Sequence, residues 1–377
     1  MAMMYRYFAV LCGIAALAGS VRSAGQDARE LRPALGGVRP LIGNDTIVSS
    51  IGSDSGCDVI FTGGEDGKIR VWDADSGRMV RVAARISGPV RSLAVNSDAS
   101  RVAASGWLGP DNAPRREAGP TSSRFAGSIL KVWQGDGSSG RTMAFNRPFS
   151  RLIALGRGRE TMVTIDTDYR LDVWNLRSGE STGSIAGAVV KGSDSNFLGA
   201  SSTSGDLRRA VSLVSARNPS ILAWDLVENA RHTIDLAGSE GYSTIALSPD
   251  GRWIAVGRNR DRRLILLDFE SGKPLFDLDG GKGGTFTFLS FSGDGKAIAA
   301  GDDLGAICTW DLGKKDCTSR VSGPEIPVRF ISFDADSLKC VSGASRHVGS
   351  PSPTTGKADV EPLMIFSIPT PELNLLR

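Results

Sequence analysis

The stretch that decides the fold is Thr62–Asp73, which reads Thr-Gly-Gly-Glu-Asp-Gly-Lys-Ile-Arg-Val-Trp-Asp. It begins at the end of the apolar run Val59–Phe61 and leaves through a second β-rich run, Ile69–Trp72, with Asp66-Gly67 between them. An Asp-Gly pair in this position is a strong signal for a two-residue hairpin turn, because both turn positions need a positive φ and glycine adopts it at little cost. The stretch therefore predicts two antiparallel strands joined by a tight turn.

The same pattern returns along the whole chain. Five of the seven tryptophans occupy the position of the tryptophan in this stretch, and a leucine and a phenylalanine occupy it in two further copies. Before each copy lies an apolar run that ends in a polar turn, most clearly in Thr244–Gly251 and Phe288–Gly295. Each unit therefore reads as four short strands with no helical periodicity. The seven repeat positions are Trp72, Trp133, Trp174, Trp224, Leu267, Trp310 and Phe366.

This pattern resembles the WD40 repeat, which has a period of about 40–45 residues and four strands per blade. The resemblance implies an all-β fold, a single seven-bladed β-propeller of four-stranded antiparallel blades over residues 25–377. An aromatic residue repeated at one strand position is then expected to pack between blades. The chain departs from the family where a Gly-His pair is expected, because Gly88-Pro89 and Gly323-Pro324 stand there. Without the family's buried His–Asp network, we expect apolar packing and disulfides to hold the blades together.

Residues 1–24 are typical of a secretory signal peptide. Arg6 supplies the positive start, Phe8–Ala18 is an apolar core, and small residues follow at Ser23-Ala24. The apolar core is shorter than the roughly 20 residues that span a bilayer, so we expect a secreted or periplasmic protein with no membrane insertion after cleavage. The formal charge of +3 falls to +1 without Arg6 and Arg22, because 42 Lys and Arg residues then face 41 Asp and Glu residues. This balance gives no support for a nucleic-acid partner.

Four cysteines follow the signal segment, in a compartment that permits disulfides. Cys308 and Cys317 flank one predicted hairpin and are candidates to face each other across it. Cys57 and Cys340 fall in the first and last blades, where a disulfide would join the two ends of a closed ring. Free buried thiols are the alternative, and it stays open at this point.

In the family, the last blade usually takes its outer strand from the N-terminal part of the chain. Two segments compete for that place here, Glu30–Leu35 and Glu372–Leu376. The sequence does not decide between them.

Two insertions interrupt the regular period. Residues 107–127 and 346–361 extend equivalent turns of the second and seventh blades, and both are rich in Pro, Gly, Ser and Thr, as loops are. The equivalent turn of the fifth blade carries an arginine cluster. Because loops on a rigid scaffold often carry function, we expect partner contacts here. The candidate partner-binding residues are Trp107, Arg115, Arg116, Arg258, Arg260 and Arg262.

A search for catalytic or metal-binding patterns finds none. The chain has two histidines, His232 in an expected outer strand and His347 in an expected loop, which argues against a His-rich metal site or a Ser-His-Asp triad. The pairs Asp302-Asp303 and Asp166/Asp168 fall at turns, where Asp is common. We therefore expect no catalytic residues, metal or cofactor.

The function expected from these observations is a non-catalytic protein–protein interaction scaffold of the cell envelope or exterior. It would bind other proteins through loops on one face. A secreted propeller enzyme of the lactonase, cyclase or quinone-dependent type, with its site at the central channel, is the alternative. The partner and the oligomeric state do not follow from the sequence.

Overall fold

The structure is a computed structural model, and all the residues that it describes lie within Arg32–Arg377. These residues contain strands and turns and no helix, as an all-β fold requires. Residues 1–35, which include the expected signal peptide, lie outside the described part, so that interpretation stays a prediction. The described residues are 36–41, 46–54, 56, 58–96, 98–107, 128–134, 140–145, 149–156, 160–166, 169–186, 198–214, 219–236, 241–321, 327–333, 337–342, 347–348, 359–360 and 363–369.

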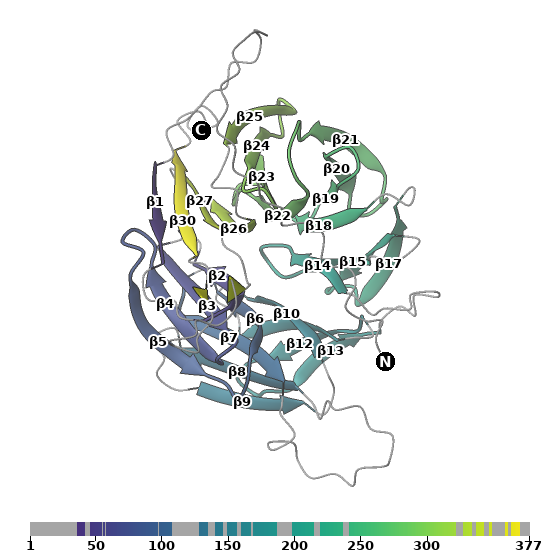
Figure 1. Ribbon diagram of the computed structural model, residues 1–377. Coiled ribbons are helices and arrows are strands. Elements are labelled where there is room, and N and C mark those ends of the chain that lie inside the picture. Colours follow the sequence, from purple (N-terminus) through teal and green to yellow (C-terminus); the bar gives the residue numbers. More distant parts are fainter. Residues whose placement is uncertain are drawn as a thin grey trace, which may run out of the picture. The chain divides into compact units, whose positions relative to one another are not determined.

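The described strands form seven four-stranded antiparallel sheets and a separate two-stranded ribbon (Figure 1). Sheets 1 to 3 are β2 (Val48–Ser53) to β5 (Met79–Arg85), β6 (Val90–Val95) to β9 (Gly140–Phe145), and β10 (Phe149–Leu155) to β13 (Ser181–Ile185). Their middle strands are β3 (Val59–Gly64), β4 (Lys68–Asp73), β7 (Arg101–Trp107), β8 (Ser128–Gln134), β11 (Thr161–Asp166) and β12 (Leu171–Asn175).

Sheets 4 to 6 repeat the same order of four strands that follow one another in the chain. They are β14 (Leu198–Thr203) to β17 (Ala230–Asp235), β18 (Tyr242–Leu247) to β21 (Pro274–Asp279), and β22 (Phe286–Phe291) to β25 (Asp316–Val321). Their middle strands are β15 (Arg209–Val214), β16 (Ser220–Asp225), β19 (Trp253–Arg258), β20 (Arg263–Asp268), β23 (Ala297–Asp302) and β24 (Ile307–Asp311).

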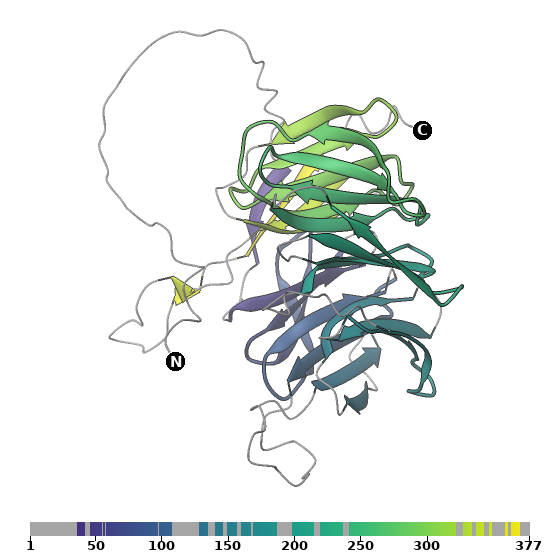
Figure 2. The same cartoon turned by 90° about the vertical axis from the view of Figure 1, so that its right-hand side faces the viewer.

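Sheet 7 takes strands from both halves of the chain. It consists of β26 (Val328–Phe333), β27 (Ser337–Ser342), β30 (Met364–Pro369) and, as its outer strand, β1 (Gly36–Pro40). Figures 1 and 2 show purple β1 beside yellow β30. The outer strand thus follows directly after Glu30–Leu35, and neither segment proposed from the sequence forms it within the described residues.

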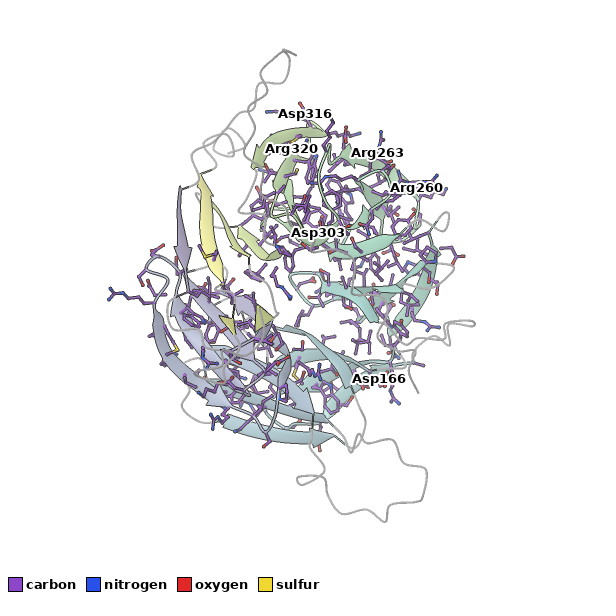
Figure 3. The ribbon with its side chains drawn as sticks, viewed as in Figure 1. Asp166, Arg260, Arg263, Asp303, Asp316 and Arg320 are labelled. Carbon is purple, nitrogen blue, oxygen red and sulfur yellow. The ribbon has the colours of Figure 1, made fainter. Side chains whose placement is uncertain are left out.

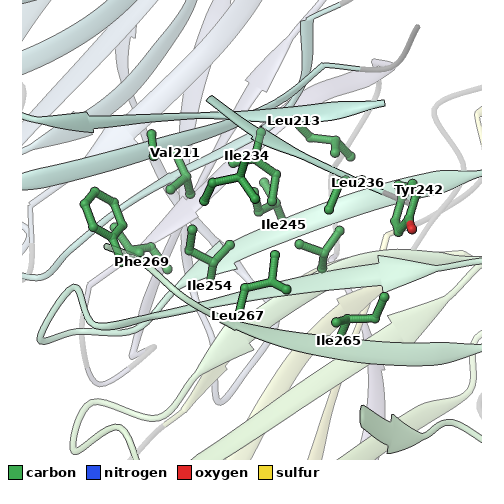
Figure 4. Packing of buried hydrophobic residues seen from close by; sticks show 14 residues of the cluster. Val211, Leu213, Ile234, Leu236, Tyr242, Ile245, Ile254, Ile265, Leu267 and Phe269 are labelled. Carbon is green, nitrogen blue, oxygen red and sulfur yellow. The ribbon is translucent and has the colours of Figure 1, made fainter. Parts of the chain in front are cut away.

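The apolar pattern of the strands explains why the sheets pack face to face. The second and third strands are buried on both faces, as in β23, whereas the outer strands β17 and β21 alternate and expose most of their side chains. The largest apolar cluster joins sheets 4 and 5 and includes Val211, Ile234 and Phe269 (Figure 4). The first strand of each sheet contacts the first strand of the next, and β2 also contacts β26. Apolar layers between neighbouring sheets thus form the core.

The repeated tryptophan lies in these layers. Trp72, Trp224 and Trp310 are fully buried, and Trp133 packs against residues of the preceding sheet. Trp72 and Trp174 donate from Nε1 to the hydroxyls of Thr62 and Thr164, both at 2.8 Å. Trp224 Nε1 is buried and has no hydrogen-bond partner among the described residues. Leu267 is also buried, whereas the side chain of Phe366 lies outside the described part.

The hairpin of the opening stretch forms, but its turn differs from the predicted one. The Gly67 N–H donates to the Gly64 carbonyl at 3.1 Å, so Glu65 and Asp66 are the central residues of a four-residue turn. Gly67 has a φ of 77°, whereas Asp66 is not among the residues with positive φ. The two-residue turn with positive φ at both positions was therefore wrong. In other turns, too, the fourth residue has a positive φ, for example Tyr169 and Leu207.

Close approach between sheets 6 and 7 requires a glycine. A Cβ on Gly301 would lie 2.4 Å from Cβ of Val328, the first residue of the next inner strand. Gly257 of sheet 5 lies equally close to sheet 6, because a Cβ added at Gly257 would lie 3.3 Å from the Phe286 side chain. Glycine at this point of the second strand lets the neighbouring sheet pack against the backbone.

Cys308 and Cys317 do not form the disulfide that was expected across their hairpin. In the register of β24 and β25, Cys308 lies opposite Arg320, and Cys317 lies opposite Trp310. Cys308 is buried with its Sγ 3.9 Å from the Gly280 carbonyl, and Cys317 is exposed, so the two are not joined. Cys57 and the Cys340 side chain lie outside the described residues, and a disulfide between them stays a prediction.

Candidate functional site

The two ends of each sheet differ in the turns that they carry. We call the end with the turn between the first and second strands the first-turn end, and the end with the turn between the second and third strands the second-turn end. Because consecutive strands run antiparallel, these turns lie at opposite ends of every sheet.

A pocket with a volume of about 820 Å³ lies at the first-turn end. Residues from all seven inner strands or the turns after them line it, so it lies where these strands converge. Three of its apolar residues are Phe288 and Phe291 from β22 and Phe330 from β26. The pocket is lined by apolar side chains together with hydroxyl and carboxylate groups, the kinds of group that ligand sites use.

The turns around this pocket share one hydrogen-bond pattern. Ser204, Ser248 and Ser292 each donate to the carboxylate of the aspartate two residues later, at 2.6 to 2.8 Å. Each hydroxyl also accepts from the backbone N–H five residues on, at 2.9 to 3.0 Å. The three serines are buried, so each turn is fixed internally. The aspartates are Asp206, Asp250 and Asp294.

These hydrogen bonds also affect the acidity of two of the carboxyl groups. Burial raises the pKa of Asp250, but hydrogen bonds from Ser248 and the Arg252 N–H outweigh burial and bring the pKa below its ordinary value. The pKa of Asp294 is lowered in the same way, with Ser292 and the Lys296 N–H as the donors. The first-turn end therefore presents carboxylates in their charged form.

Two ionisable residues of the described part line the pocket, and both are acidic. Asp54 lies in the first turn of sheet 1 and Asp206 in the first turn of sheet 4. Among the described residues, no group of three or more His, Cys, Asp or Glu is placed to hold a metal ion. In the same part of the chain, no helix is long and apolar enough to cross a membrane.

The residues predicted to bind a partner belong to the second-turn end. The strands that flank residues 107–127 and 346–361 place both insertions at that end of sheets 2 and 7. Trp107 is the last residue of β7 and pairs with Ser128, while its side chain, Arg115 and Arg116 lie outside the described part. The second insertion is not all loop, because β28 (His347–Val348) pairs with β29 (Asp359–Val360).

The arginine cluster of sheet 5 divides into side chains with different roles. Arg258 is mostly buried and pairs with Asp261 at 2.5 Å and with Asp277 at 3.4 Å. Arg260 is exposed, and Figure 3 shows it with Arg263, where β20 begins. Partner binding by Arg258 and Arg260 stays a prediction.

Arg262 is used inside the fold. It is 6% exposed and has a φ of 54°. Its Nη1 lies 2.7 Å from Oδ2 of the fully buried Asp302, and its Nε donates to the Gly280 carbonyl at 2.9 Å. The guanidinium lies 4.9 Å from the ring centre of Phe286 and also donates to the Gly284 carbonyl. The side chain that the sequence placed in a partner site thus joins sheets 5 and 6.

Asp302 completes this cluster. Its carboxylate accepts from the N–H groups of Gly284, Leu304 and Ala306 at 2.7 to 3.1 Å. We expected the blades to rest more on apolar packing and on disulfides, and the structure adds a buried Arg–Asp pair that joins two sheets.

Sequence reasoning missed the pocket. Its lining runs from Ser53 to Ser332, and no local motif connects these residues. One signal in the sequence is the repeated Ser-x-Asp turn, in Ser248–Gly251 and Ser292–Gly295, because these turns lie around the pocket.

Comparison with known proteins gives one family match and distant relatives. The family described as "WD domain, G-beta repeat" matches residues 38–73, which extend from β1 to the end of β4. The chain is 28% identical over 264 residues to Protein tipD of Dictyostelium discoideum, covering 67% of the chain and 38% of that protein. It is 23% identical over 294 residues to Autophagy-related protein 16 of Arabidopsis thaliana, covering 67% of the chain and 53% of that protein. The chain thus spans about half or less of these relatives, and the matches support a WD40-repeat protein.

Proposed function

We propose that this protein is a non-catalytic interaction scaffold built on a seven-bladed WD40-like propeller. The seven four-stranded sheets and the contact between β2 and β26 support this architecture. The repeat match at residues 38–73 supports the family. WD40 repeats are typically surfaces for assembling other proteins, and our proposal carries that role to this chain.

The observation that carries the proposal is the pocket at the first-turn end. It has the size of a binding site, and its ionisable lining consists of Asp54 and Asp206 from opposite parts of the repeat order. Within the described residues, Asp54 and Asp206 come from separate sheets and Asp206 pairs with Arg208, an arrangement that supplies no acid–base or nucleophilic pair. Rigid turns around an apolar pocket instead fit a surface that binds a partner protein.

We propose that the protein acts outside the cytoplasm, at the cell envelope or exterior. The support is the sequence of residues 1–24, with its positive start, short apolar core and small residues near the expected cleavage site. Determination of the N-terminal residue of the protein purified from its host tests this location. A mature chain that begins after residue 24 supports it, and an intact Met1 in cytoplasmic material contradicts it.

Affinity capture from the native host tests the scaffold function. The full chain is compared with a variant that lacks residues 108–127 and with Phe330→Arg, which places a bulky charge in the pocket. We expect a specific partner to be retained by the first variant and lost with the second, and melting temperatures of both variants check that the fold is kept. Loss with the loop deletion alone would place the working surface at the second-turn end, and capture of no partner by the full chain would contradict the scaffold function.

A further inference from the structure

The outer strand of sheet 1 exposes apolar side chains where other outer strands expose polar ones. Six large apolar side chains of the described residues are exposed, and three of them belong to β5: Met79, Val80 and Val82, at 40%, 57% and 46%. The outer strand β17 instead exposes Arg231 and Thr233. A solvent-facing edge strand normally carries polar side chains, because an apolar edge attracts other chains. Apolar side chains that gather on one such strand therefore indicate a contact surface.

We propose that β5 is a docking surface for an acidic segment of a partner protein. Apolar residues of that segment pack on Met79, Val80 and Val82, and its carboxylates pair with Arg78 and Arg85 at the two ends of the strand. We call these five residues the β5 patch. The patch adds a second contact surface to the proposed scaffold, and it does not rest on the pocket, with which it shares no residue.

The register of β5 shows how a partner can reach the patch. In the pairing with β4, Met79, Val82 and Arg85 lie opposite every second residue, so their side chains share one face of sheet 1. Val80 has no partner in β4, because one residue of β5 is skipped there. Such a bulge re-aims a side chain and interrupts the pairing of a further strand. The partner is therefore expected to dock on the side chains of β5 and not to extend the sheet.

Both ends of the patch carry a positive charge. Arg78 and Arg85 are exposed, and within the described part of the chain neither guanidinium is paired with a carboxylate. The carboxylates nearest to Arg78 in the sequence are Asp73 and Asp75, and Asp73 is held by the N–H and the hydroxyl of Ser76 at 2.7 and 2.5 Å. An arginine fork matches the geometry of a carboxylate. These charges favour a partner segment with acidic residues on both sides of its apolar ones.

The same charges disfavour a second copy of this chain as the occupant. In a twofold contact between two β5 strands, Arg78 of one copy would approach Arg85 of the other, and like charges repel. A membrane surface is also disfavoured. Binding to anionic lipids typically uses clusters of roughly four to eight basic residues, whereas the β5 patch carries two. A protein segment with apolar and acidic residues matches both features of the patch.

Direct binding of labelled peptides to the full chain tests the proposal. The probe is the fluorescein-labelled peptide Glu-Glu-Leu-Thr-Val-Leu-Glu-Glu, which when extended separates its outer glutamates by roughly 20 Å, as the strand separates Arg78 from Arg85. One counterpart carries glutamine in place of glutamate, and another carries serine in place of leucine and valine. By fluorescence anisotropy, we expect the probe to bind roughly fivefold more tightly than either counterpart, with affinity that falls as salt rises. Equal binding of the glutamate and glutamine peptides, or no binding of the probe, would overturn the proposal.

Apolar variants locate the binding on β5. Val80→Ser combined with Val82→Ser should weaken the probe roughly fivefold. Leu275→Ser is the matched control, because Leu275 is also an exposed apolar residue of an outer strand, and it should leave the affinity unchanged. Melting temperatures of both variants check that the fold is kept. An unchanged affinity of the double variant would contradict the role of the patch.

Charge reversal gives a readout that a folding defect does not produce. Arg78→Glu combined with Arg85→Glu should lose the probe and gain binding of the same peptide with lysine in place of glutamate. Arg231→Glu, at an exposed arginine of β17, should change the binding of neither peptide. If the reversed variant does not gain the lysine peptide, charge does not select the partner and the proposal fails.

Two further measurements examine the other occupants. A dimer in analytical ultracentrifugation, or flotation with phosphatidylserine vesicles, would overturn the proposal if it is lost when Val80 and Val82 are changed to serine. Phe330→Arg in the pocket should leave the affinity for the probe unchanged. A partner that is lost with Phe330→Arg while the probe still binds would confirm that the two surfaces are separate, so either one can fail without the other.

Discussion

The two ends of the sheets use the same residue types for opposite purposes. At the first-turn end, Asp206 lies on a turn with its side chain half exposed, held by a hydroxyl and directed to a pocket. At the second-turn end, Asp302 is fully buried and paired with Arg262 at 2.7 Å. The first arrangement leaves charge available to a ligand, and the second uses it to join two sheets. Burial, which the sequence does not state, decides between these roles.

The largest effect is expected where the charge is buried. Arg262→Ala leaves the Asp302 carboxylate without its cation, and breaking a buried pair in this way costs roughly 3–5 kcal/mol. Chemical denaturation should show a marked fall in the midpoint. The neighbouring exposed Arg260→Ala serves as the control and should change stability by less than about 0.5 kcal/mol. Equal midpoints for the two variants would contradict the role of the buried Arg262–Asp302 pair in joining sheets 5 and 6.

A second test asks whether the two ends also differ in packing. Gly301→Ala places a Cβ 2.4 Å from Cβ of Val328, so the sheets must move apart at a cost of roughly 1–3 kcal/mol. At the first-turn end, a Cβ on Gly293 meets nothing within 4 Å, and Gly293→Ala should be neutral within about 0.5 kcal/mol. Melting temperatures of the two variants, measured together, check the difference. If Gly301→Ala leaves the melting temperature unchanged, sheets 6 and 7 pack less tightly at Val328 than the structure shows.

The Ser-x-Asp turns should contribute a moderate amount. Ser248→Ala removes a buried hydroxyl that donates to Asp250 at 2.6 Å and accepts from the Trp253 N–H at 2.9 Å. The loss is expected to be roughly 1–2 kcal/mol, because a buried N–H loses its acceptor. Ser271→Ala, in an exposed turn with a similar bond to Asp268, should lose less than half as much. Denaturant midpoints that rank the two in the reverse order would contradict this account.

The smallest effect concerns acid at the first-turn end. Hydrogen bonds from Arg177 and Arg101 lower the pKa of Glu160 to about 2. Because the folded pKa lies below the ordinary value of 4.5, Glu160 contributes stability above that value, and the contribution is lost as the pH falls towards 2. Glu160→Gln should lower stability at pH 7 slightly. It should also make the decrease in melting temperature between pH 5 and pH 3 less steep, as measured by thermal melts. The control Glu180→Gln, at an exposed residue, should leave the pH dependence of the melting temperature unchanged. If Glu160→Gln also leaves it unchanged, the Glu160 carboxylate does not stabilise the fold in this way.

Most of the fold followed from the repeated hairpin. Strand alternation and the spacing of tryptophans predict four-stranded antiparallel units, because these patterns report local burial. The exact turn did not follow, since Asp66-Gly67 fits a two-residue turn as well as the observed one in which only Gly67 has positive φ. The partners of the cysteines did not follow either. The register of β24 and β25 places Cys308 opposite Arg320 and Cys317 opposite Trp310, so the two cysteines do not face each other.

The candidate site was much harder to predict. Loops rich in Pro, Gly and Arg attract attention in a sequence, yet Arg262 proves to be a buried contact between sheets. The pocket arises from the ends of seven inner strands, each of which contributes a few ordinary residues such as Ser202 or Leu247. Only the convergence of these strands gives them a common surface, and convergence is a property of the whole fold.

The position of β1 has a consequence for how the chain assembles. Gly36 pairs with Ser367, so the strand nearest the start of the described chain must meet one of the last strands before sheet 7 is complete. Contacts between residues this distant close late, because a long loop must lose its freedom first. The first sheets to be synthesised can pack in sequence, whereas β1 has no partner until β30 emerges. A circular permutant that joins β1 directly after β30 would make every sheet local, and its refolding should be faster even though the native contacts are the same.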